Sequence, residues 1–315
     1  MKTNPKHPLV VAALTVGLCF MLAGRVAAQT FTTLYSFTAA PSSPPAVNSD
    51  GAWPTSRLLL SGNFLYGTTA YGGRSGYGSA FAVKTDGTGF TNLYSFAYAH
   101  TNSSGGYPKS GLVLSSNLLY GTAQTCGSVG YGTVFAVSPS GMGCTTVHDF
   151  QGISDGAAPS GPLLLSSNLL YGTAVYGGSA VYGGTVFAMR PDGSGFRVVH
   201  NFPTNSSSNV DGSEPQGDLA LSASSTTLYG AAMMFGGAGY TTNYTYYPGS
   251  GTVFAVNTDG SGVRTLHQFA YGGGLPPLIV AAVSRLAAWF YRPRATLCMG
   301  RRKTAAVPAM DWCSP

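Results

Sequence analysis

The feature that most constrains this chain is an internal repeat of 51–58 residues. A Leu-Tyr-Gly tripeptide recurs, with its tyrosine at Tyr66, Tyr120, Tyr171 and Tyr229. A second motif follows each tripeptide, Gly-Ser-Ala-Phe in the first unit and Gly-Thr-Val-Phe in the others, and it ends at Phe81, Phe135, Phe187 and Phe254. Periodic landmarks at this length indicate like units that bury their apolar surface against one another.

Each unit divides into four short apolar segments. The first is an apolar run, at 58–60, 112–114, 163–165 and 219–221, whose continuity predicts burial on both faces. The second and third carry the two motifs. An Asp-Gly or Ser-Gly pair precedes the fourth and predicts a hairpin, because glycine accepts the positive φ that such turns need. Four strands a unit predict an all-β fold, a β-propeller of four-stranded antiparallel blades. A β-helical solenoid is the alternative.

The units span residues 54–96, 108–150, 159–202 and 215–269, within a repeat domain at 29–270. An extra copy of the fourth strand stands alone at 31–37. We interpret it as a closing strand that completes the last blade and removes exposed sheet edges. Closure of this kind requires a last unit with strands one to three only, so we expect an incomplete ring in this chain.

The linkers between units add a third landmark, Asp-Gly-x-x-Pro, at Asp50, Asp155 and Asp211, with Ser104-Gly105 as the departure. With the other motifs it resembles the GloVer tandem repeat of exported bacterial proteins, whose C-terminal anchors vary. The resemblance covers roughly residues 31–270. It implies export and a repeat architecture, and it carries no catalytic residues and no assigned activity.

Residues 1–28 have the pattern of a signal peptide: Lys2 and Lys6, an apolar stretch from Leu9 to Leu22, and small residues before Gln29. A permanent membrane anchor is the alternative, and no transmembrane segment is expected in the mature chain. The net charge of +6 comes from the two ends, since residues 29–270 hold seven basic and nine acidic residues. This balance argues against a nucleic-acid partner. We expect a periplasmic, cell-surface or secreted protein.

The repeat landmarks stop after Phe269, and we interpret residues 271–315 as a fifth repeat read in the wrong frame. Codons for Cys298-Met299-Gly300, read one base earlier, spell Leu/Met/Val, Tyr/His and Gly. The same frame turns Met310 to Ser314 into Gly-Leu-Val-Phe/Leu. Its tyrosine and phenylalanine codons lie 15 apart, as do Tyr66 and Phe81. A divergent C-terminal domain is the alternative.

Candidate ligand-binding residues are the tyrosines of the longest loop between the second and third strands: Tyr240, Tyr244, Tyr246 and Tyr247. Loops of this kind carry function on rigid scaffolds. The recurring tyrosines of Leu-Tyr-Gly are interpreted instead as packing between blades.

The histidines, turn aspartates and cysteines do not predict a metal site or a disulfide. His148, His200 and His267 hold one place in successive units, too far apart to share a metal ion. Asp86, Asp192 and Asp259 are interpreted as turn residues, because calcium needs a cluster of oxygen ligands. Cys126 and Cys144 fall at opposite ends of a blade, which argues against a disulfide.

No catalytic, cofactor or metal residues are predicted. The favoured hypothesis is a non-enzymatic binding or surface-display propeller with a glycan or protein ligand. The alternative is a propeller enzyme that acts on glycans or lactones through channel residues, among which acids from different blades would converge.

Overall fold

In a computed structural model of the chain, the structure describes residues 31–40, 47–97, 105–179, 181–203, 210–234, 236, 240–242, 245–247 and 251–269. The chain divides into two units, Met1–Ser36 and Phe37–Pro315. Residues 31–36 of the first unit are described and form no strand. All strands below belong to the second unit.

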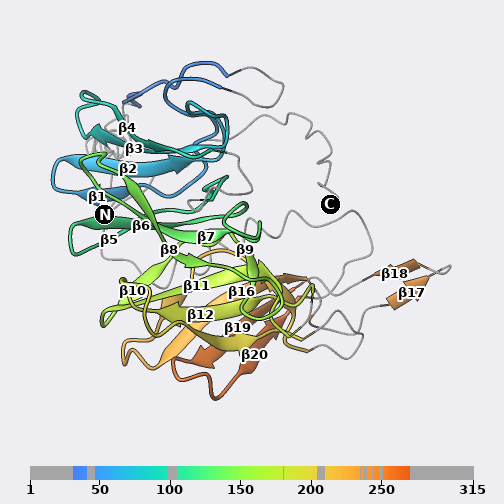
Figure 1. The fold of residues 1–315 in the computed structure, drawn as a ribbon. Helices are drawn as coiled ribbons and strands as arrows, with labels where there is room; N and C mark the ends of the chain where they lie inside the picture. The colour runs from blue at the N-terminus through green and yellow to red at the C-terminus, as the bar shows by residue number, and fades with distance from the viewer. Residues whose placement is uncertain are drawn as a thin grey trace, which may run out of the picture. The chain divides into compact units, whose positions relative to one another are not determined.

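Four antiparallel sheets follow the four repeats (Figure 1). Blade 1 contains β1 (Leu59–Ser61), β2 (Phe64–Thr69), β3 (Ser79–Lys84) and β4 (Thr91–Ser95). Blade 2 contains β5 (Val113–Ser115), β6 (Leu118–Ala123), β7 (Thr133–Val137) and β8 (Cys144–Asp149). Blade 3 contains β9 (Ala157–Pro159), β10 (Leu164–Ser166), β11 (Leu169–Tyr176), β12 (Thr185–Met189) and β13 (Arg197–Asn201). Blade 4 contains β14 (Ser213–Pro215), β15 (Ala220–Leu221), β16 (Thr227–Met234), β19 (Thr252–Asn257) and β20 (Arg264–Gln268). The all-β prediction of four-stranded antiparallel propeller blades is confirmed, with no helix among the described residues.

The first strand differs from its prediction. In blades 3 and 4 it is split: β9 and β14 pair with the end of the second strand, and β10 and β15 with its beginning. Burial on both faces is wrong, because Leu58 and Leu60 are 47% and 62% exposed. The reason is that a preceding blade covers this run, and no described blade precedes blade 1; Leu58 holds the position of Leu112, Leu163 and Leu219. Leu112, Leu163 and Leu219, just before the later first strands, are buried by the preceding blade.

The hydrophobic core lies between blades. Each of three clusters joins the second to fourth strands of one blade to the motif strands of the next. At the first boundary, Tyr66 and Phe96 of blade 1 pack with Leu119 and Phe135 of blade 2. A blade is therefore stabilised mainly by its neighbours, as face-to-face sheet packing requires.

Two motif glycines are explained by close approach. A Cβ on Gly121 of Leu-Tyr-Gly would lie 2.6 Å from Phe135 Cζ and 2.8 Å from Leu112 Cδ2. Gly132 opens the second motif with a φ of 93°, and a Cβ there would meet Pro159 of the next linker at 2.6 Å. Glycine is the residue that tolerates both conditions.

Hydrogen bonds hold each linker to its blades. The Thr185 hydroxyl of the second motif donates to the Asp155 carbonyl at 3.1 Å, and Asp155 Oδ1 accepts from Gln151 N at 2.8 Å. Asp50 repeats this with Thr38, whose N–H donates at 2.9 Å and whose hydroxyl also bonds to the carboxylate. The linker aspartate thus ties the end of one repeat to the start of the next.

The segment predicted as a closing strand ends at Phe37, which packs on blade 1. Its ring lies 5.2 Å from Phe81, edge to face. This repeats the contact of Phe96 with Phe135, at 4.8 Å. Phe37 therefore has the place of a fourth-strand phenylalanine that precedes blade 1. Completion of a last blade by residues 31–37 stays a prediction.

Candidate ligand-binding face

Aromatic side chains gather at the end of the blades that carries the second-to-third loops and the linkers. Trp53 lies 5.1 Å from Tyr71, Tyr71 lies 5.2 Å from Tyr107, and Tyr107 lies 5.2 Å from Tyr77, all edge to face between ring centroids. Trp53 is 63% exposed. We call Trp53, Tyr71, Tyr77 and Tyr107 the aromatic cluster; it crosses the boundary of blades 1 and 2.

The residue before each linker proline has an uncommon backbone conformation. Trp53, Tyr107, Ala158 and Glu214 have φ values of 59°, 55°, 53° and 56°. Non-glycine residues rarely adopt this left-handed region, which costs of order 1–2 kcal/mol. An inter-blade hydrogen bond helps to hold it: Tyr107 N donates to Tyr77 O at 2.9 Å, and Glu214 N to Gly183 O at 2.8 Å.

This position varies among the blades although its backbone does not. It is tryptophan, tyrosine, alanine and glutamate in turn, so the fold does not dictate its side chain. A strained backbone that presents different side chains from blade to blade is a pattern associated with function.

A second group lies at the boundary of blades 3 and 4. Tyr176 and Tyr182 pack edge to face at 6.2 Å, and Tyr182 is 58% exposed. Glu214, the only glutamate of the chain, has a raised pKa because burial disfavours its charge. Burial also raises the pKa of Tyr176, and the Glu214 charge adds to the shift.

The predicted ligand tyrosines lie in the corresponding loop of blade 4. Tyr240 belongs to β17 (Tyr240–Thr242), and Tyr246 and Tyr247 belong to β18 (Thr245–Tyr247). The two strands pair as a hairpin, with Tyr240 opposite Tyr247. Tyr244 lies outside the described residues. Their ligand-binding role stays a prediction, and sequence reasoning missed the aromatic cluster, whose signal was the variable residue before each linker proline.

Three of the four recurring tyrosines pack between blades as predicted, and the fourth, Tyr229, is partly exposed. Tyr66, Tyr120 and Tyr171 are buried, and each belongs to the cluster that its blade shares with the next. Burial raises the pKa of Tyr120, and the Asp192 charge adds to the shift.

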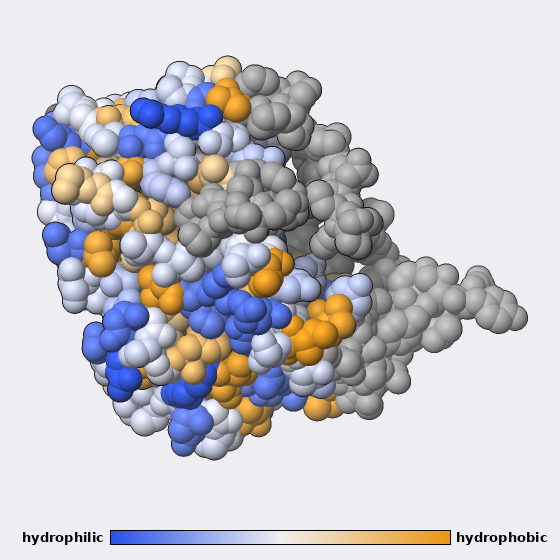
Figure 2. All heavy atoms as spheres, in the orientation of Figure 1, coloured by the Kyte–Doolittle hydropathy of each residue, from blue (hydrophilic) through white to orange (hydrophobic). Residues whose placement is uncertain are grey.

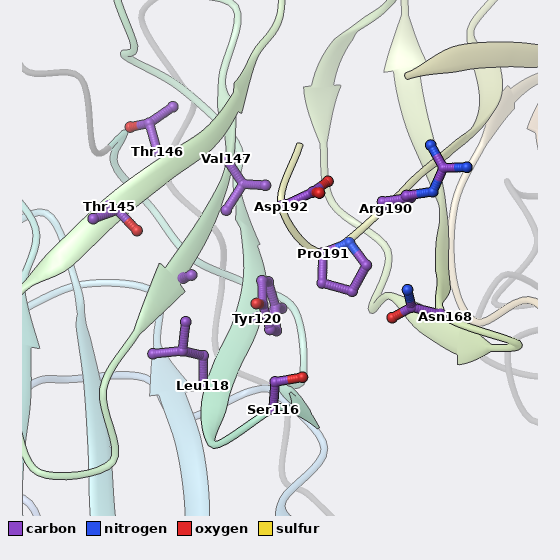
Figure 3. A pocket seen from close by; sticks show the side chains of 11 residues that line it. Ser116, Leu118, Tyr120, Thr145, Thr146, Val147, Asn168, Arg190, Pro191 and Asp192 are labelled. Atoms are coloured by element: carbon purple, nitrogen blue, oxygen red, sulfur yellow. The ribbon is translucent and has the colours of Figure 1, made fainter. Parts of the chain in front are cut away.

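A shallow groove opens beside Tyr120 at the opposite, hairpin end of blades 2 and 3, with a volume of about 470 Å³. Figure 3 shows Ser116, Leu118 and Tyr120 on one side, facing Pro191 and Asp192 of the next blade's hairpin. On the face shown in Figure 2, polar and apolar residues are intermixed. The groove follows from the packing of a hairpin on its neighbour, since a Cβ on Gly193 would meet Val147 O at 2.6 Å.

The three histidines have separate environments. His148 Nε2 lies 2.9 Å from Asp155 Oδ2, His200 is half-buried with Nε2 unpaired, and His267 is exposed. Burial lowers the pKa of His200, although the Asp211 charge opposes the shift. Among the residues that the structure describes, no group of three or more His, Cys, Asp or Glu side chains could hold a metal ion.

The turn aspartates act as predicted. Asp86, Asp192 and Asp259 each accept a backbone N–H two residues on, at 2.8–2.9 Å. Hydrogen bonds from Thr88, Ser194 and Ser261 lower their pKa values. Neither Cys126 nor Cys144 is part of a disulfide. Cys126 has a φ of 63° where blade 1 has Gly72, which explains the glycine that it replaces.

First-strand segments carry several ionisable residues. Arg57 Nη1 lies 3.4 Å from Asp218 Oδ2, which joins corresponding positions of blades 1 and 4. Burial raises the pKa of Asp218 against the effect of Arg57, and burial lowers the pKa of Lys109.

Blades of antiparallel strands that share cores with their neighbours, and that carry a variable aromatic loop end, define a repeat protein of the β-propeller class. The Gloeobacter/Verrucomicrobia repeat matches residues 96–291, and the chain belongs to that family. The GloVer resemblance is thereby confirmed.

Solved structures of low identity are similar in fold. TolB from Acinetobacter baumannii has a TM-score of 0.43 at 11% identity, over 78% of this chain and 48% of that chain. The GH74 xyloglucanase from Xanthomonas campestris has a TM-score of 0.41 at 13% identity, over 67% of this chain and 29% of that one. The chain thus spans about half the length of this TolB and less than a third of the length of this xyloglucanase. No curated protein matches the sequence. Among the described residues, no helix is long and apolar enough to cross a membrane.

Proposed function

We propose that the protein is an exported, non-enzymatic binding propeller whose loop end takes up the ligand, with a glycan as the favoured class. The observation that carries the proposal is the aromatic cluster. In it an exposed Trp53, at a strained and variable position, packs on Tyr71, which in turn packs on Tyr107. Export rests on the signal-peptide pattern of residues 1–28 and on the family.

The side chains at this end favour stacking on a neutral ligand over recognition of a charged one. Tryptophan and tyrosine offer rigid apolar surface with a polar group at the edge, at a small cost in conformational entropy. The apolar C–H faces of a sugar ring can stack on such surfaces while the phenol groups bond to its hydroxyls. Tyr182 and Tyr131, which are 58% and 47% exposed, extend the aromatic surface toward later blades.

The test is a screen of the full chain against neutral polysaccharides and protein ligands, followed by calorimetry on any ligand found. Trp53→Ala should weaken binding at least tenfold, because central aromatic residues dominate interface energies. Met142→Ala is the matched control, since Met142 is 84% exposed at the hairpin end. Equal affinities for the two variants would refute the aromatic cluster as the site, and a protein ligand alone would refute the glycan class.

A second candidate function is a propeller enzyme acting on glycans or lactones. It is favoured by the acids with raised pKa values, Glu214 and Asp218, and by the ion pair of Asp218 with Arg57. If this is the function, product should form from oligosaccharide or lactone substrates, and Asp218→Asn should abolish turnover while binding persists. Binding without any turnover in the unmodified chain would leave the first proposal standing.

A further inference from the structure

One face of blade 4 is exposed, and the corresponding face of blades 1 to 3 is covered by the next blade. The fourth-strand phenylalanines Phe96, Phe150 and Phe202 are fully buried, whereas Phe269, at the same position, is partly exposed. Leu93 and Val199 are 4% and 6% exposed, whereas their counterpart Leu266 is 48% exposed.

The second and third strands show the same difference. Tyr66, Tyr120 and Tyr171 are buried, whereas Tyr229 is partly exposed. Val134 and Val186 are fully buried, whereas Val253 is partly exposed. We call Tyr229, Val253, Leu266 and Phe269 the open face of blade 4. In the earlier blades this set of positions is covered by the motif strands of the next repeat.

We propose that the open face is the docking surface for strands one to three of a fifth blade, and that codons 289–314 encode these strands in the frame one base earlier. The local sequence of blade 4 is that of a blade with a successor. Its Val-Phe strand, its fourth strand and its terminal phenylalanine are all present, and β20 pairs with β19 through the same register shift as in blades 1 to 3.

A further codon constraint supports this occupant. Trp289-Phe290-Tyr291 must be encoded TGG-TTY-TAY, which in the earlier frame reads NTG-GTT-YTA, or Leu/Met/Val, Val and Leu. This is the apolar run of a first strand, like Leu112-Val113-Leu114. It starts nine codons before the leucine of the shifted Leu-Tyr-Gly, as Leu219 lies nine residues before Leu228 in blade 4; in blades 1 to 3 the separation is seven, as between Leu112 and Leu119. Three landmarks of one repeat therefore lie in one frame, in the order of the repeat and within the range of its spacings.

The N-terminal part of the second unit fits this arrangement. Phe37 packs on Phe81 as the terminal phenylalanine of a blade before blade 1. Blade 4 cannot be that blade, because β20 already supplies its fourth strand. A further unit that lacks a fourth strand of its own is needed, and the shifted frame spells strands one to three.

The experiment compares the chain as it stands with a form that has one base added between codons 269 and 288. Each carries Leu266→Cys, and maleimide labelling at position 266 is read by peptide mass spectrometry. We expect labelling at position 266 to slow at least tenfold in the restored frame. Val199→Cys is the matched control, because the equivalent position in blade 3 is 6% exposed and should label slowly in both forms.

Equal labelling of position 266 in the two forms would overturn the proposal. Slow labelling in the chain as it stands, lost on dilution, would overturn it in favour of a second copy on the open face. Rapid labelling of the Val199→Cys control would show that the substitution disrupts blade 3. The two forms without cysteine substitutions would then be compared by urea unfolding, followed by circular dichroism. The restored frame must unfold at a higher midpoint, and an unchanged midpoint counts against a fifth blade.

Discussion

Truncation of the fourth-strand phenylalanine should cost far more in blade 3 than in blade 4. Phe202 is fully buried, with its ring centroid 5.0 Å from Phe254 of the next blade and 4.6 Å from His200. Phe202→Ala removes this packing and leaves a cavity between two blades. Such a change costs about 3–5 kcal/mol of unfolding free energy.

Phe269→Ala is the same change at the same repeat position. Phe269 is partly exposed, and its described ring contact is with His267, at 4.7 Å within its own strand. Partial burial of one aromatic side chain stabilises by about 1 kcal/mol, since full burial is worth roughly 1.5–3 kcal/mol.

The assay is urea unfolding of the full chain, followed by far-ultraviolet circular dichroism. With a slope of about 2 kcal/mol/M, Phe202→Ala should lower the midpoint by about 2 M and Phe269→Ala by about 0.5 M. Equal shifts would refute the reasoning, because they would mean that the open face of blade 4 is as well covered as the boundary between blades 3 and 4.

Three further changes test other parts of the structure. Gly121→Ala should lower the urea midpoint by the equivalent of about 1–3 kcal/mol, because its Cβ would lie 2.6 Å from Phe135 Cζ, and an unchanged midpoint would contradict this packing. The lowered pKa of His200 means that the unfolded chain takes up a proton first, so stability should fall as the pH drops below about 6.5. His200→Phe should make the midpoints at pH 7 and pH 5 more similar, and an unchanged difference would exclude His200 as the cause. The raised pKa of Glu214 gives a pH dependence of the opposite sign, because stability is lost as the pH rises through the folded-state pKa. Glu214→Gln should therefore raise the urea midpoint at pH 7 and leave it unchanged at pH 4. A gain at both pH values would mean that the charge is not responsible.

Local sequence was sufficient for the blades because their determinants lie within one repeat. The Asp-Gly turns, the motif glycines and the alternation of short apolar segments specify strands and hairpins through the neighbouring backbone alone. The first strand was the exception. Its apolar run predicted a strand buried on both faces, but Leu60 is 62% exposed. Its counterparts Leu114, Leu165 and Leu221 pack at the boundary with a preceding blade, and no described blade precedes blade 1.

The loop end was predicted in part. Sequence reasoning selected the tyrosines of the longest loop, Tyr240 to Tyr247, because of their number. It missed Trp53 and Tyr107, which lie 54 residues apart and meet through Tyr71 only after blade 2 packs on blade 1. Contacts between repeats depend on how far each linker turns, and a single repeat does not encode that.

By itself, the sequence determined the repeat unit, its four strands, its turns and the residues that each blade offers to its neighbour. Only the tertiary structure decided which of those surfaces is covered. Phe202 and Phe269 close the same motif, yet one is buried and the other partly exposed. The physical reason is that burial here comes from the next blade rather than from a residue's own strand, so identical local sequences have different environments.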